Sequence, residues 1–209
     1  SKPKTQILNQ ITGTEKIIAI GASTGGTEAI KEVLLELPAN SPAIVIVQHM
    51  PAGFTTTFAA RLDKLSKVRV KEAEDGERIL PGHAYLAPGG LHLEIVKSGA
   101  NYLAKLVDTG LVSGHKPSVD VMMSSLARIG AQNCIAMILT GMGKDGAQGL
   151  LEIRQSGGHT IAQDESSCVV YGMPKEATNR NAACQELPLA DISKAVVEYL
   201  NKVGGSSRL

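Results

Sequence analysis

Three side chains of the types needed for acyl transfer each follow an apolar segment of this chain. Ser23 ends the first segment, His49 follows the second, and Asp145 lies in a glycine-rich loop after a later one. A serine hydroxyl is a weak nucleophile until a neutral imidazole accepts its proton, and a carboxylate on the far ring nitrogen fixes the tautomer and stabilises the imidazolium. These residues are therefore a candidate catalytic triad, in a chain order that differs from the Ser, Asp, His order of α/β-hydrolases.

Buried strands must position the three residues. The apolar runs 16–22, 43–47 and 134–139 are continuous, which is typical of strands covered on both faces. In an open parallel sheet, ligands bind beyond the carboxyl ends of the strands. Residues that follow such strands can therefore meet at one edge of the sheet.

Helical patterns alternate with these runs. Ile30, Val33, Leu34 and Leu37 recur at the spacing of one buried helix face. We expect further helices over 54–65, from a Ser118 cap to Ile129, after Gly146 and over 192–203, and a further strand over 159–163. The alternation predicts an α/β fold with a doubly wound, mostly parallel sheet and helices on both faces.

Three segments lie outside the alternating pattern. Short alternating runs within 68–96, punctuated by glycine and proline, predict an antiparallel hairpin extension at the sheet edge. Residues 1–13 are polar and resemble a linker, and 204–209 resemble a flexible tail. We therefore expect one catalytic domain over 14–203.

Each candidate residue also has a structural alternative. Ser23 could cap the following helix, His49 could be a hydrogen-bonded structural histidine, and Asp145 could be a turn residue. The glycines around Ser23 could cradle a phosphate, although a dinucleotide loop needs glycine at position 23 and an acidic residue near His49. The rival histidines and acids are His83, His92, His115, His159, Asp120 and Asp164.

Composition excludes several function classes. The net charge is +1, tryptophan is absent and only two phenylalanines occur, so we expect no nucleic-acid partner. No apolar run approaches the roughly 18 residues of a membrane span, and residues 1–6 lack the apolar core of a signal peptide, which predicts a cytoplasmic protein without membrane insertion. The three cysteines have no metal-binding or redox spacing, so we expect neither metal nor cofactor; Cys134 suits a buried strand, and Cys168 is a weaker alternative nucleophile.

Three loop sequences resemble the signature loops of bacterial chemotaxis protein-glutamate methylesterases, the CheB family. They are residues 20–26, 47–51 and 139–146, with further similar stretches at 88–90, 115–120 and 171–174. The resemblance implies a hydrolase that removes methyl groups from glutamyl γ-methyl esters on chemoreceptor cytoplasmic helices, releases methanol and deamidates receptor glutamines. Chemoreceptors would then be the protein partners.

The resemblance also implies a role for each matching residue. Ser23 would be the nucleophile, His49 the general base and then acid, and Asp145 the orienting carboxylate. Thr24, Met142 and Gly25 would shape the oxyanion environment around the triad. Family members usually carry an N-terminal receiver domain, which this sequence is expected to lack, together with its control by phosphorylation. The alternatives from other classes are a nucleotide- or phosphate-binding module and a non-catalytic receptor-adaptor domain.

Overall fold

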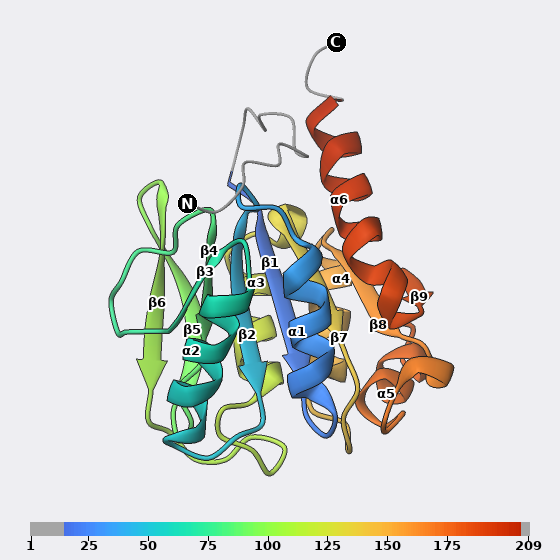
Figure 1. Cartoon of the computed structure of the whole chain (residues 1–209), viewed down its shortest axis with the longest axis horizontal. Helices are drawn as coiled ribbons and strands as arrows, with labels where there is room; N and C mark the ends of the chain where they lie inside the picture. The colour runs from blue at the N-terminus through green and yellow to red at the C-terminus, as the bar shows by residue number, and fades with distance from the viewer. Residues whose placement is uncertain (1–14, 206–209) are drawn as a thin grey trace.

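The structure, a computed structural model, describes residues 15–205, and its centre is one parallel sheet (Figure 1). Seven strands pair in the order β3-β4-β2-β1-β7-β8-β9, and each of these pairings is parallel. Their bounds are β1 (Ile17–Ala22), β2 (Ala43–Gln48), β3 (Arg69–Glu72), β4 (His83–Leu86), β7 (Cys134–Ile138), β8 (His159–Gln163) and β9 (Gln185–Leu187). The doubly wound, mostly parallel sheet predicted from the sequence is confirmed.

Helices cover both faces of this sheet. They are α1 (Gly26–Glu36), α2 (Phe54–Leu65), α3 (Val119–Arg128), α4 (Ala147–Gln155), α5 (Met173–Asn179) and α6 (Leu189–Gly205), with the short 3₁₀ turns η1 (Ala131–Asn133) and η2 (Glu165–Ser167). Along β1, Ile18 and Ile20 pack with α1, α2 and α6, whereas Ile17 and Ala19 pack with α3, α4 and α5. Strands β1, β2, β4 and β7 therefore contribute alternate side chains to two separate cores.

The predicted helices occur at the expected places. The stripe from Ile30 to Leu37 is fully buried, the segment 54–65 is α2, and Ser118 caps α3 by accepting a hydrogen bond from Val121 N. Phe54 lies outside the α2 stripe, because it is 63% exposed at the first turn. None of the helices in residues 15–205 combines the length and apolar character needed to cross a membrane.

The predicted hairpin is misplaced in the sequence interpretation. Within 68–96, β3 and β4 pair in parallel with each other, and β4 also pairs in parallel with β2, so both belong to the main sheet. The antiparallel pair is instead β5 (His92–Ser98) with β6 (Asn101–Val107), a separate two-stranded sheet. It packs on α3, where Ile95 N donates to Ser125 Oγ, and its β6 edge bonds to residues 76–79. Because these neighbours occupy its edges, the hairpin does not extend the main sheet.

The proposed domain limits remain predictions. The linker-like segment 1–13 lies outside the described residues, as does 206–209. At the other limit, α6 (Leu189–Gly205) starts three residues before the predicted helix 192–203 and ends two residues after it.

Candidate active site

Three loops leave the sheet side by side at its carboxyl edge. Strand β1 lies between β2 and β7, with Ala22 paired to Gln48 and Gly21 paired to Ile138. The ladder continues one step further, since His49 N donates to Ala22 O at 3.2 Å and Ser23 N donates to Thr140 O at 3.0 Å. Strand register therefore brings the loops of Ser23, His49 and Asp145 together.

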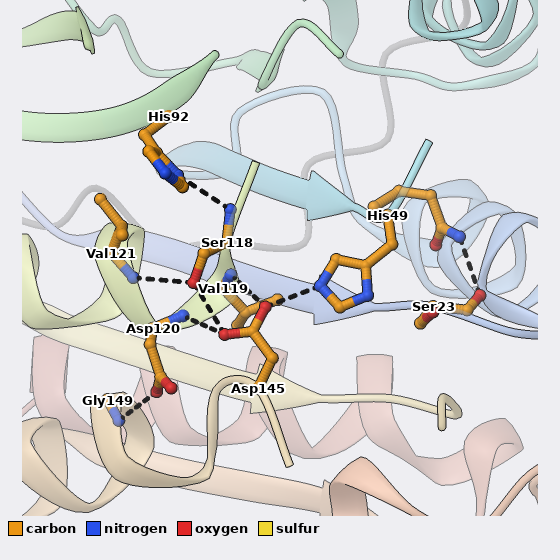
Figure 2. Close-up of polar contacts among 10 residues, drawn as sticks. Ser23, His49, His92, Ser118, Val119, Asp120, Val121, Asp145 and Gly149 are labelled. Carbon is orange, nitrogen blue, oxygen red and sulfur yellow. Dashed lines mark hydrogen bonds and ion pairs between the residues drawn. The ribbon is translucent and has the colours of Figure 1, made fainter. Parts of the chain in front are cut away.

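His49 and Asp145 form a buried hydrogen-bonded pair (Figure 2). His49 Nε2 lies 2.6 Å from Asp145 Oδ2, and the two side chains are 7% and 1% exposed. The other ring nitrogen, Nδ1, has no hydrogen-bond partner among the described residues. A carboxylate can only accept, so Nε2 carries a hydrogen, and in the neutral imidazole Nδ1 presents its lone pair.

The carboxylate of Asp145 receives four hydrogen bonds in all. Besides His49, the donors are Ser118 Oγ at 2.8 Å, Val119 N at 2.8 Å and Asp120 N at 3.0 Å (Figure 2). Two of these donors are first-turn amides of α3, where the positive end of the helix dipole favours an anion. Burial opposes ionisation, but the bonds from His49 and from the α3 amides outweigh it and lower the pKa of Asp145. The group is therefore a carboxylate near neutral pH.

Ser23 lies on the side of His49 opposite Asp145 (Figure 2). Its carbonyl accepts from Gly26 N at 2.7 Å and from Gln48 Nε2 at 2.8 Å, which fixes the turn into α1. Within residues 15–205 no hydrogen bond joins Ser23 Oγ to His49. Among the non-glycine residues in this range, only Ser113 and Asn181 have a positive φ, so Ser23 has an ordinary backbone conformation. Ser23 thus lacks the strained backbone of a nucleophile elbow.

Ser23 is not a helix cap. The N-cap of α1 is Gly25, with φ of 80°, and no side chain caps this helix. The conformation at Gly25 lies in the left-handed region that glycine adopts without a steric penalty. The structural alternative for Ser23 is therefore wrong, and its partly exposed side chain is left for another use.

The remaining predicted site residues flank Ser23. Thr24 is exposed, and Met142 is 65% exposed on the neighbouring loop. That loop presses on the serine, because a Cβ added to Gly141 would lie 2.8 Å from Ser23 Cβ. The backbone N–H groups of Thr24 and Met142 donate to no acceptor within the described part of the chain. Two amides without an acceptor in this part of the chain therefore follow Ser23 and Gly141 directly in the sequence.

His115, which the sequence offered only as an alternative to His49, contacts His49 directly. Its ring stacks on His49, with centroids 3.6 Å apart and planes 8° from parallel. Burial, followed by the nearby His49, lowers the pKa of His115, although Asp145 opposes this shift. An open cavity of about 330 Å³ lies beside the two rings, lined by His49, Met50, Pro51, Leu111, Gly114, His115, Lys116 and Pro117.

Among the other rivals, only Asp120 and His92 come near the triad. Asp120 accepts from Gly149 N at 2.8 Å and thereby joins α3 to α4, and His92 reaches Ser118. His83 bonds to Pro81 O, His159 stacks on Tyr199, and Asp164 caps η2.

Cys134 and Cys168 do not offer a better nucleophile. Burial raises the pKa of Cys134 to about 12 and that of Cys168 to about 11, so neither forms a thiolate readily. In the part of the chain that the structure covers, His, Cys, Asp and Glu side chains form no group of three that could hold a metal ion.

Comparisons with known proteins identify the family of the chain. The profile of the CheB methylesterase family matches residues 18–196. The chain is 59% identical over 199 residues to "Protein-glutamate methylesterase/protein-glutamine glutaminase 2" of Pseudomonas aeruginosa, covering 95% of this chain and 57% of that protein. It is 54% identical over 209 residues to the Chromohalobacter salexigens protein-glutamate methylesterase/protein-glutamine glutaminase, covering all of this chain and 59% of that protein.

A solved structure gives the same result for the fold. The catalytic domain of Thermotoga maritima CheB methylesterase superposes with a TM-score of 0.87 at 41% identity, covering 90% of this chain and 100% of that one. The present chain spans somewhat more than half the length of the curated relatives above. From the profile match, the relatives and the shared fold together, the chain belongs to the CheB methylesterase family.

Proposed function

We propose that this chain is a serine hydrolase that cleaves glutamyl γ-methyl esters on chemoreceptor helices and deamidates receptor glutamines. The observation that carries the proposal is the buried 2.6 Å contact between His49 and Asp145, which leaves His49 Nδ1 as a free base beside the Ser23 loop. The substrate class rests on the relatives, which are named protein-glutamate methylesterase/protein-glutamine glutaminase. The proposed site of action is the cytoplasm.

In the proposed reaction, Ser23 Oγ attacks the γ-carbonyl carbon of the ester and gives its proton to His49 Nδ1. Asp145 stabilises the resulting imidazolium and keeps Nε2 protonated. The carbonyl oxygen becomes an oxyanion, and the unpaired N–H groups of Thr24 and Met142 are the proposed donors to it. Ser23 N cannot serve, because it already donates to Thr140 O.

Collapse of the tetrahedral intermediate breaks the bond to the methoxy group. His49 returns the proton to that oxygen, so methanol leaves and a glutamyl ester of Ser23 remains. Water then adds to this ester with His49 again as base, which restores Ser23 and releases the glutamate carboxyl group. A glutamine substrate follows the same steps with ammonia as the leaving group. Contact between Ser23 Oγ and His49 must tighten on substrate binding, as is common for catalytic hydrogen bonds that are loose in the free enzyme.

The phosphate-binding alternative has less support. An anion cradle uses several free amides of one loop, but in the loop 21–26 Ser23 N already donates to Thr140 O and Gly26 N to Ser23 O, which leaves fewer donors for a phosphate. The adaptor alternative predicts receptor binding without turnover. Both alternatives therefore differ from the proposal in what they predict for substrate turnover.

The test is methanol release from a methylated receptor cytoplasmic fragment. We would compare the natural sequence with Ser23→Ala and with Ser98→Ala, an exposed serine at the end of β5. Circular dichroism checks that all three proteins are folded. Release by the natural sequence and Ser98→Ala, but not by Ser23→Ala, supports the proposal. If none of them releases methanol while receptor binding is detectable, the adaptor function is favoured instead.

A further inference from the structure

His92 is a completely buried histidine outside the triad whose two ring nitrogens both have partners. It begins β5, and its Nδ1 accepts from Ser118 N at 3.2 Å, while Nε2 bonds to Gly110 O at 2.8 Å. An amide N–H only donates and a carbonyl only accepts, so the ring is neutral with its hydrogen on Nε2. The environment of His92 selects one tautomer.

The two partners of His92 lie near the two ends of the loop 108–118. One ring thus joins Gly110 to Ser118 across this segment, and we call these three residues the His92 latch. Inside the loop, His115 stacks on His49. The latch therefore ties together the loop whose His115 ring packs against one face of the His49 ring.

Ser118 extends the latch to the carboxylate of the triad. Its Oγ donates to Asp145 Oδ1 at 2.8 Å, and the amides of the next two residues bond to the same carboxylate (Figure 2). Because Ser118 is the N-cap of α3, its backbone N–H points away from the helix ladder. His92 satisfies this N–H and so fixes the residue that aims the α3 amides at Asp145.

We propose that His92 is a positioning residue for ester hydrolysis, which acts through Ser118 and the loop 108–118 to orient Asp145 against His49. This inference rests on the proposed function above. A neutral imidazole is required, since a second ring N–H would face the Ser118 N–H and break the latch. His92 itself does not touch the reacting atoms.

Three substitutions separate the two arms of the latch. His92→Phe fills the buried volume but removes both bonds. His92→Asn keeps an acceptor near the position of Nδ1, and His92→Gln keeps a donor near the position of Nε2. We expect His92→Phe to lower kcat about 10- to 100-fold with little change in KM, because small misplacements of catalytic groups have effects of this size. We expect His92→Asn to recover more kcat than His92→Gln, since only the Ser118 arm leads to Asp145.

A spectroscopic signal tests the latch without substrate. The His49 Nε2 proton, held in the short bond to Asp145, should give a downfield proton resonance in the natural protein. We expect this resonance to be lost or broadened in His92→Phe and restored in His92→Asn, while the backbone amide signals persist in both variants. His83→Phe is the matched control, because His83 also bonds a backbone carbonyl, Pro81 O, but lies at the amino end of β4.

Equal kcat in the Phe, Asn and Gln variants overturns the proposal, as does a higher kcat in His92→Gln than in His92→Asn. An unchanged His49 resonance in folded His92→Phe also overturns it. If the natural sequence hydrolyses no ester, the proposed function fails, but the resonance still reports on whether His92 positions the pair.

Discussion

The two sides of the His49 imidazole have contrasting surroundings. On one side, Asp145 is buried and receives four hydrogen bonds, two of them from the α3 amides. On the other side, the partly exposed Ser23 hydroxyl has no bond to the ring, and the amides of Thr24 and Met142 have no acceptor among residues 15–205. The carboxylate is thus fixed in the free protein, whereas the Ser23 side keeps donors available. In the proposed reaction, this preorganisation would place charge stabilisation where the transition state needs it.

Removing the nucleophile should have the largest effect. Ser23→Ala eliminates the only covalent step proposed on the open side, so we expect kcat to fall by several orders of magnitude. Stability should change little, because Ser23 is a partly exposed turn residue. Methanol release and urea unfolding measure the two quantities. Near-normal turnover by a folded Ser23→Ala protein would contradict the assignment.

On the buried side, Asp145→Asn should have the next largest effect. The amide group can donate to His49 Nε2 and so favour hydrogen on Nδ1, which removes the base from the serine side. By analogy with other triads the loss in kcat is on the order of 10⁴-fold, smaller than that for the serine. Single-turnover kinetics would measure it. A loss equal to or greater than that of Ser23→Ala would indicate a second role for Asp145.

Gln48→Leu tests the support of the open side. Gln48 Nε2 holds Ser23 O, whereas its buried Oε1 has no partner within the described chain. We expect kcat to fall about 10-fold through a looser Ser23 turn. The free energy of unfolding should change by no more than about 1 kcal/mol, since the substitution also removes an unpaired buried oxygen. Unchanged kcat would show that Gly26 N alone holds the turn.

The smallest expected effect concerns pH and stability at His115. Its folded pKa lies below the ordinary value of 6.5, so as pH falls below 6.5 the unfolded chain binds a proton that the folded chain does not. This group therefore lowers the free energy of unfolding toward acid pH. The lowered pKa of Asp145 acts in a separate window, where stability is lost only as pH falls below 3.8.

Urea unfolding on either side of pH 6.5 measures this contribution. His115→Phe keeps an aromatic ring against His49 but cannot titrate, so its stability should depend less on pH in that window. An equal pH dependence in both proteins would assign the titration to another group.

Much of the fold and the placement of the candidate site could be predicted from the sequence. Continuous apolar runs mark the central strands, and parallel strands end at one edge, so Ser23, His49 and the Asp145 loop were expected to meet. The orientation of the site could not be predicted in the same way. The contacts of His115, Ser118 and His92 depend on how the loop 108–118 folds back onto the site, and no local sequence pattern predicts that conformation.

The misplaced hairpin has a similar explanation. Both β4 and β5 are short segments, and local patterns do not distinguish a strand that enters the parallel sheet from one that pairs separately. Burial of the β5–β6 face against α3 decides the outcome, and that is a property of the packed protein.

The separation of the β5–β6 hairpin from the main sheet has a consequence for thermal inactivation. In the part of the chain that the structure describes, no strand ladder joins the hairpin to the seven-stranded sheet, so we expect it to open as a sub-global unit with a lower free energy than whole-domain unfolding. Opening would release His92 and with it Ser118, while the sheet carrying Ser23 and His49 stays intact. Heating should therefore abolish the proposed esterase activity before the main circular dichroism transition, and amides of residues 92–107 should exchange with deuterium ahead of those in β1 and β7.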